Sequence, residues 1–169
     1  DNFDALRSNL KKAGKALEEE EKASRLVTAF NSALSSFPQP KKILSAFVLQ
    51  PSRAGAGKVS LLDDILRTAG LINISTNHSL MGVGWLTLDK VIQAKPEIII
   101  SDVNPRWPSL GHLAMRHPAY SAIRDRQGQA PRQITLPANL WNCGGSHVAK
   151  AISILVKAQI KVLRKRVKP

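Results

Sequence analysis

The sequence has little cysteine, few aromatic residues and no long hydrophobic run. Its single cysteine, Cys143, excludes an internal disulfide and a metal site built from several thiolates. The longest apolar runs fall far short of the roughly 20 residues that a membrane-spanning helix needs. The first residues show no basic segment followed by an apolar one, so we expect a signal peptide to be absent or already removed. With 169 residues and 43% hydrophobic residues, one globular domain is the expected class.

Acidic residues are also scarce: 12 stand against 25 lysines and arginines, which gives a formal net charge of +13. From Lys150 onward the chain has seven basic residues and no acidic one. The simplest interpretation is a solvated helix face whose cations are favourable near a helix C-terminus. Contact with a membrane or a partner is a second interpretation. Nucleic-acid binding is disfavoured, because no aromatic residues alternate with the basic ones to stack on bases.

Hydrophobic periodicity divides the chain into a long helix and an α/β unit. Apolar residues at helical spacing predict one helix over residues 5–37, whose length is typical of a connection between lobes. Apolar runs predict buried strands at 43–49 and 96–101 and an edge strand at 133–136. Helices are expected at residues 61–69, 87–94, 117–123 and 146–166. The pattern predicts an α/β fold: a three-layer, Rossmann-like lobe with a mostly parallel sheet at 41–169, preceded by a connecting helix at 1–38.

Tryptophan placement indicates where a ligand would bind. Only 5% of residues are aromatic, yet all three tryptophans fall in predicted loops or at helix starts: Trp85, Trp107 and Trp141. Ligands of parallel sheets lie at the carboxyl ends of the strands, and two of these tryptophans follow such ends. A single loop tryptophan usually packs on its own core. Three of them favour a flat apolar wall for a large ligand.

No pattern indicates catalysis or a resident metal. The segment around Gly55 departs from a phosphate-binding loop, since Ser52 and Val59 stand where glycine and serine or threonine are required. The four histidines lack metal-ligand spacing. Cys143 has no evident base partner, so a small buried residue is the simpler interpretation. We therefore expect no enzyme, no catalytic residue, no cofactor and no metal site.

Three sets of segments carry a resemblance to a known family. Residues 66–73 fit the pattern Leu-x-x-Ala-Gly-x-x-Asn, and residues 84–100 are similar to the segment that follows it in that family. The pairs and runs His117–Tyr120, Leu136–Pro137 and Leu140–Trp141 match the last third. In order and spacing, about residues 5–160 resemble the helical-backbone (class III) periplasmic substrate-binding proteins of ABC importers for ferric siderophores, haem and cobalamin.

The resemblance implies two α/β lobes joined by a rigid helix, with the ligand in the cleft between them. This chain would supply the connecting helix at 1–38 and the C-terminal lobe at 41–169, without the N-terminal lobe. It would capture a metal chelate and deliver it to a permease, and the iron or cobalt would belong to the ligand. The implied location is the periplasm, or the outside of a cell with a membrane anchor. Contact with the membrane would then be made only through the permease or a lipid anchor.

The resemblance also implies site residues. Trp141 resembles the aromatic residue that members place against the ligand after the last strand, and the segment from Met81 to Trp85 resembles a loop of the cleft. Trp107 and Arg53 are further candidates, Arg53 because a fork-shaped cation suits acidic siderophores and haem propionates.

Docking on the permease would use an acidic residue of this lobe, and Asp64 or its neighbour Asp63 resembles it. The alternative is that both are first-turn acids favoured by the helix dipole. Two other functions remain open from sequence: an α/β domain, enzymatic or regulatory, whose basic tail binds nucleic acid or another polyanion, and a truncated, inactive remnant.

Overall fold

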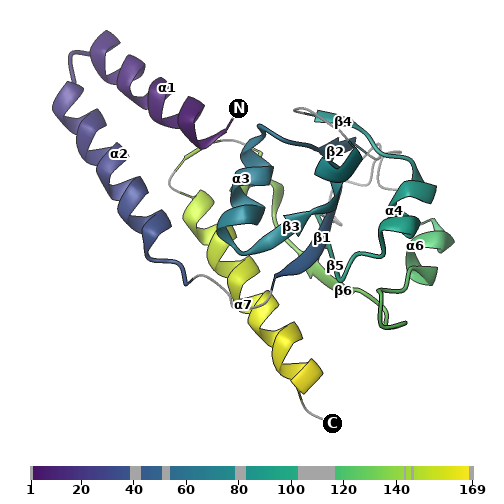
Figure 1. Ribbon diagram of the computed structural model, residues 1–169. Helices are drawn as coiled ribbons and strands as arrows, with labels where there is room; N and C mark the ends of the chain where they lie inside the picture. The colour runs from purple at the N-terminus through teal and green to yellow at the C-terminus, as the bar shows by residue number, and fades with distance from the viewer. Residues whose placement is uncertain are drawn as a thin grey trace.

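A parallel β-sheet forms the centre of the protein (Figure 1). The computed structural model describes residues 2–38, 43–50, 54–78, 83–102, 117–142, 144–145 and 147–167. The strands are β1 (Leu44–Leu49), β3 (Leu71–Asn73), β5 (Ile98–Ser101) and β6 (Arg132–Thr135). Their order is β3-β1-β5-β6, and each neighbouring pair is parallel. The predicted parallel sheet is confirmed, and β3 is an edge strand that the sequence analysis missed.

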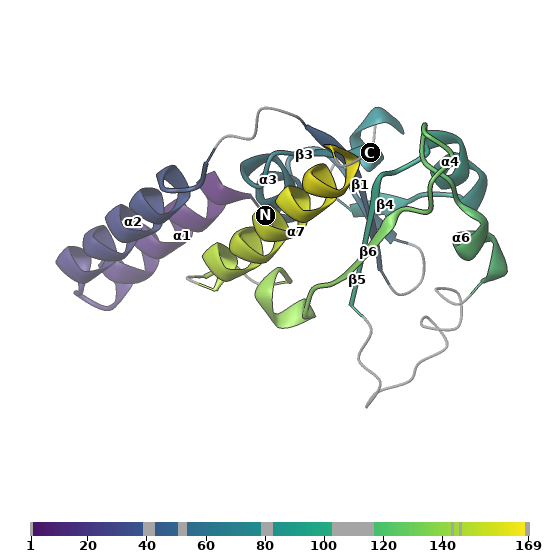
Figure 2. The ribbon, with the colours of Figure 1, turned by 90° about the horizontal axis from the view of Figure 1, so that it is seen from below.

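Helices cover both faces of this sheet, which confirms the three-layer α/β architecture (Figures 1 and 2). One face carries α3 (Leu61–Thr68) and α7 (Val148–Val167), and the other carries α4 (Leu88–Ala94) and α6 (Pro118–Ala122). Successive residues of a strand point to opposite faces, so the central strands supply two separate hydrophobic cores. This explains why β1 and β5 read as continuous apolar runs, whereas the edge strand β6 buries only Ile134.

The N-terminal segment is a hairpin of two helices, α1 (Phe3–Ala16) and α2 (Glu20–Ser35), so the prediction of one continuous helix is wrong (Figure 1). The chain reverses at Glu18, whose φ of 55° lies in the left-handed region. The amide of Glu19 then donates to the carbonyl of Gly14 at 2.7 Å. The two apolar stripes face each other, and the rings of Phe3 and Phe30 meet edge to face at 5.3 Å. A role of this segment as a connection between lobes stays a prediction.

The tight approach of the two helices at Gly14 gives a test of the hairpin. A Cβ atom at this position would overlap the side chain of Ala23 and lie 3.2 Å from the carbonyl oxygen of Glu19. We expect Gly14→Ala to lower the free energy of unfolding by about 1–3 kcal/mol, as overpacking does. Urea denaturation followed by circular dichroism measures it. In an unobstructed helix the same change raises stability by up to about 1 kcal/mol, so an increase would contradict the contact with α2.

Candidate functional site

A two-stranded ribbon lies beyond the carboxyl end of β1, where ligands of parallel sheets bind (Figure 1). Its strands are β2 (Ala54–Ala56) and β4 (Val83–Trp85), which pair antiparallel with Ala54 opposite Trp85. The side chain of Trp85 is 72% exposed. An exposed indole at this edge is available for contact with a ligand. Of the two predicted ligand-binding residues that lie in the described part of the chain, Trp85 is the one in solvent at the expected edge.

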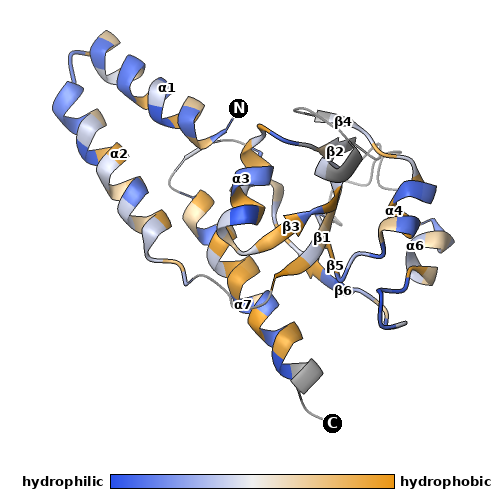
Figure 3. Cartoon of the chain, viewed as in Figure 1, coloured by the Kyte–Doolittle hydropathy of each residue, from blue (hydrophilic) through white to orange (hydrophobic). Residues whose placement is uncertain are grey.

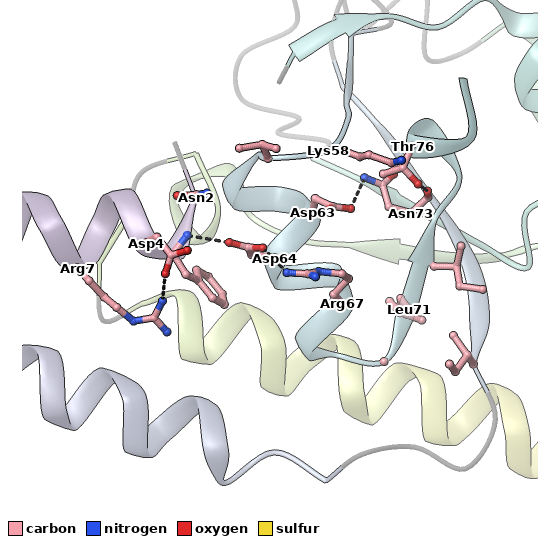
Figure 4. Close-up of a pocket in the computed structure, with 15 residues that line it drawn as sticks. Asn2, Asp4, Arg7, Lys58, Asp63, Asp64, Arg67, Leu71, Asn73 and Thr76 are labelled. Carbon is pink, nitrogen blue, oxygen red and sulfur yellow. Dashed lines mark hydrogen bonds and ion pairs between the residues drawn. The ribbon is translucent and has the colours of Figure 1, made fainter. Parts of the chain in front are cut away.

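The amide of Asn73 fastens this ribbon to the rest of the lobe (Figure 4). Asn73 ends β3 and is 3% exposed. Its Nδ2 donates to the carbonyl oxygen of Ala56 at 2.7 Å and to Oδ1 of Asp63 at 3.1 Å. Its Oδ1 accepts from the backbone amide of Ser75 at 3.1 Å. One buried side chain thus joins the ribbon, α3 and the 3₁₀ turn Ile74–His78, and it holds the strand opposite Trp85 in place.

The turn between the ribbon and α3 is fixed by Ser60. Its hydroxyl donates to the carbonyl of Gly57 at 2.7 Å and accepts from the amide of Asp63 at 3.1 Å, so Ser60 is the N-cap of α3. The preceding Val59 has a φ of 60°, an uncommon conformation for a β-branched residue. The loop that leaves the ribbon therefore enters the helix in one defined direction.

Both acids predicted to dock on a permease have partners within the chain (Figure 4). The carboxylate of Asp63 accepts from Asn73, and the residue is 8% exposed. Asp64 accepts from the backbone amide of Phe3 through Oδ2 and from Arg67 through Oδ1, both at 2.7 Å. Asp64 thereby ties the start of α1 to α3. A docking role for either acid stays a prediction.

An open groove of about 760 Å³ lies beside α3, β3 and the start of α1 (Figure 4). It includes neither Trp85 nor Trp141. Three acids and three basic residues line it, namely Asp4, Asp63, Asp64, Arg7, Lys58 and Arg67. Its acids already pair with Arg7, Asn73 and Arg67. The groove therefore offers no excess charge for a ligand.

Trp141 lies in the hydrophobic core and not at the surface. It is 4% exposed, and its indole Nε1 donates to the carbonyl of Leu136 at 3.1 Å. In this position it packs with the core that includes Val148 and Ile152 of α7. Contact with a ligand stays a prediction for this residue. Met81, Trp107 and Arg53 lie outside the described residues.

The described side chains show no arrangement for metal chemistry. Across these ranges, no group of three or more His, Cys, Asp or Glu residues could hold a metal ion. Asp89 lies at the start of α4, next to the ribbon, and its carboxyl is exposed. The side chain of Thr87 donates a hydrogen bond to this carboxyl, which lowers its pKa below the ordinary value. Over the same part of the chain, no helix is both long enough and apolar enough to span a membrane.

Comparisons with known proteins bear on the fold. No protein-family model and no curated protein sequence matches the chain. Among solved structures, an ABC-type Fe³⁺-hydroxamate transport protein from Saccharomonospora viridis has a TM-score of 0.73 at 17% identity, over 94% of this chain and 56% of that one. A periplasmic haem-binding protein from Pseudomonas aeruginosa has a TM-score of 0.71 at 18% identity, over 93% and 60%.

The molybdate periplasmic binding protein MolA from Haemophilus influenzae also matches, with a TM-score of 0.65 at 16% identity, over 98% of this chain and 52% of that one. The chain thus spans little more than half the length of these proteins. At such identities the likeness concerns the fold. Over the part of their length that it spans, the chain has the fold of these ABC-type substrate-binding proteins, the class that its sequence motifs resemble.

Proposed function

We propose that this chain is the C-terminal lobe, with its connecting helices, of a substrate-binding protein that captures a metal chelate and delivers it to an ABC permease. The ligand class is a ferric siderophore, haem or cobalamin, and the location is the periplasm or the outer side of an anchored cell membrane. Binding is non-enzymatic. The observation that carries the proposal is the exposed indole of Trp85 at the carboxyl edge of the sheet.

Two of the three solved structures support the ligand class without selecting a member of it, and the third is described with a ligand outside it. Their descriptions name Fe³⁺-hydroxamate, haem and molybdate, which are metal chelates and an oxyanion. A flat, exposed indole suits haem, because a porphyrin presents a flat apolar surface to a protein. None of these three proteins is described as binding nucleic acid, so the polyanion-binding alternative gains no support from them.

Binding is measured by titrating the chain, and the full gene product that contains it, with haem, a ferric hydroxamate, cobalamin and molybdate. Tryptophan fluorescence, corrected for absorbance by the ligand, reports binding, and isothermal calorimetry confirms it. We expect Trp85→Ala to weaken binding of the preferred chelate by about 2 kcal/mol, or roughly thirtyfold, as loss of a central aromatic contact does.

Two control variants separate ligand contact from general effects. Trp85→Phe keeps an aromatic face and should retain most of the affinity. Leu26→Ala removes an apolar side chain that is 50% exposed on α2, away from the ribbon, and should leave affinity unchanged. Failure of the full gene product to bind any of the four ligands would contradict the proposal. Equal affinity of Trp85→Ala and the unmodified protein would remove Trp85 from the site.

A further inference from the structure

Helix α7 carries a stripe of basic side chains that the proposed function does not use. Lys150, Lys157, Lys161 and Arg164 are separated by seven, four and three residues, so they share one side of the helix. All four are exposed, and they extend over about 21 Å of helix. The helix contains no acidic residue. We call these four residues the basic stripe.

Packing fixes the direction in which the basic stripe points. The opposite side of α7 is buried through Val148, Ile152 and Leu155, which belong to the core beneath α3. Gln159, 1% exposed, donates from Nε2 to the carbonyl of Gly70 at 2.7 Å. Along α7, hydrophobic and hydrophilic residues alternate, as expected for a helix with one buried and one exposed side (Figure 3). The helix cannot turn the stripe inward without exposing this core.

The cations of the stripe are not neutralised within the described part of the chain. The ion pairs there join Arg7 to Asp4, Arg25 to Glu21 and Arg67 to Asp64, and none involves the stripe. Lys161 shares a groove of about 390 Å³ with Arg132 and Glu97. The carboxylate of Glu97 already accepts from the amide and hydroxyl of Ser45, at 2.8 and 3.1 Å. With two cations against one carboxylate, the groove keeps a net positive charge toward the amino end of β6.

We propose that the basic stripe binds the anionic surface of a phospholipid membrane, with α7 lying along the headgroups. Lysine and arginine near an anionic bilayer each strengthen binding. Ile160, 39% exposed, sits one turn from Lys157 and Arg164, and an apolar side chain among cations suits the boundary between headgroups and acyl chains. No aromatic residue lies in α7 to stack on nucleic-acid bases.

This binding leaves the candidate ligand site free. The C-terminal end of α7 and the ribbon that carries Trp85 lie at opposite ends of the lobe (Figure 1). A protein held through the C-terminal end of α7 would remain near the membrane with its ligand edge uncovered. The proposal does not depend on the identity of the ligand or on ligand binding at all.

The test is co-sedimentation of the full chain with vesicles of phosphatidylcholine, with and without phosphatidylglycerol, at low and high salt. The stripe variant is Lys157→Glu, Lys161→Glu and Arg164→Glu. Its control, Lys11→Glu, Lys12→Glu and Lys15→Glu, changes the net charge equally at exposed positions of α1. We expect binding that requires phosphatidylglycerol, falls with salt, and drops about a hundredfold in the stripe variant but only a few-fold in the control.

A further variant, Ile160→Asn, separates a lipid surface from other polyanions. It should weaken binding to vesicles and leave any binding to duplex DNA unchanged. Circular dichroism checks that each variant is folded. Several results would overturn the proposal: no binding to anionic vesicles at low salt, an equal loss in both charge variants, or DNA binding as tight as vesicle binding with the same dependence on the stripe. Displacement by soluble glycerol phosphate at matched ionic strength would indicate a phosphate pocket instead and would also overturn it.

Discussion

Replacement of Trp141 by alanine is expected to lower the free energy of unfolding by about 3–5 kcal/mol. The indole is 4% exposed and packs in the main core, so its removal leaves a large cavity between η3 (Ala138–Leu140) and α7. It also deprives the carbonyl of Leu136 of the hydrogen bond from Nε1. Urea denaturation of the chain, followed by far-ultraviolet circular dichroism, measures the loss.

Two other tryptophan variants make this result specific. Trp141→Phe keeps most of the volume and loses only the hydrogen bond, so about 1–2 kcal/mol is expected. Trp85→Ala changes an exposed side chain and should stay within about 0.5 kcal/mol. A stable Trp141→Ala variant with impaired chelate binding would instead place this indole at the ligand. Because we expect Trp141→Ala to be unstable, Trp85 is the better position at which to test ligand contact.

Replacement of Asn73 by alanine is expected to cost about 2–4 kcal/mol, although only a small polar side chain is lost. The variant leaves the carbonyl of Ala56, the carboxylate of Asp63 and the amide of Ser75 without this partner in a buried site. Urea denaturation gives the magnitude. Hydrogen exchange should show the largest increase at the ribbon, because Asn73 is its link to β3 and α3. Asn142→Ala, at an exposed asparagine, is the control and should change stability by less than about 0.5 kcal/mol.

The variant Asn73→Asp adds a dependence on pH. The new carboxyl would replace an amide that donates to Asp63, and burial beside another carboxylate would raise its pKa in the folded state above its unfolded value. A group with a raised folded pKa contributes more stability below its unfolded pKa and loses that contribution as the pH rises. The free energy of unfolding of Asn73→Asp should therefore be lowest at neutral pH and should rise again as the pH falls toward 4. Equal loss at both pH values would contradict the direct contact with Asp63.

Trp85 and Trp141 show that the sequence does not predict which tryptophan of the candidate site is exposed. Both fall in predicted loops or at helix starts and neither has a distinctive neighbour in sequence, yet one is 72% exposed and the other 4%. Their difference depends on which surfaces cover them. The ribbon leaves Trp85 in solvent, whereas η3 and α7 enclose Trp141, and such coverage comes from residues distant in the chain.

In the sequence, Asn73 stands out only as part of a family pattern and Asp64 only as a possible docking acid. Their structural partners lie 17 and 61 residues away in the chain, at Ala56 and Phe3. No local signal predicts hydrogen bonds over such separations. The sequence hints at the structural role of Asn73 only through its position. The residue follows a short apolar pair that comes just after the end of a predicted helix.

The hairpin of α1 and α2 is a second feature that no local pattern in the sequence predicts. Apolar spacing continues on both sides of residues 18–21, so periodicity alone favours one helix. The reversal depends on a left-handed Glu18 and on the close approach that Gly14 permits. Burial of Phe3, Val27 and Phe30, at about 1.5–3 kcal/mol for each fully buried side chain, offsets the cost of about 1–2 kcal/mol for one left-handed residue, and this burial exists only after folding.

The sequence by itself determined the α/β class, the buried strands β1 and β5, the edge strand β6 and the helices α3, α4, α6 and α7, because these follow from local hydrophobic periodicity and capping. It also determined the basic stripe, since helical spacing sets which side chains share a side. Only the tertiary structure decided the hairpin, the edge strand β3, the burial of Trp141 and the exposure of Trp85. Each of these depends on contacts between distant segments, whose free energy no local pattern contains.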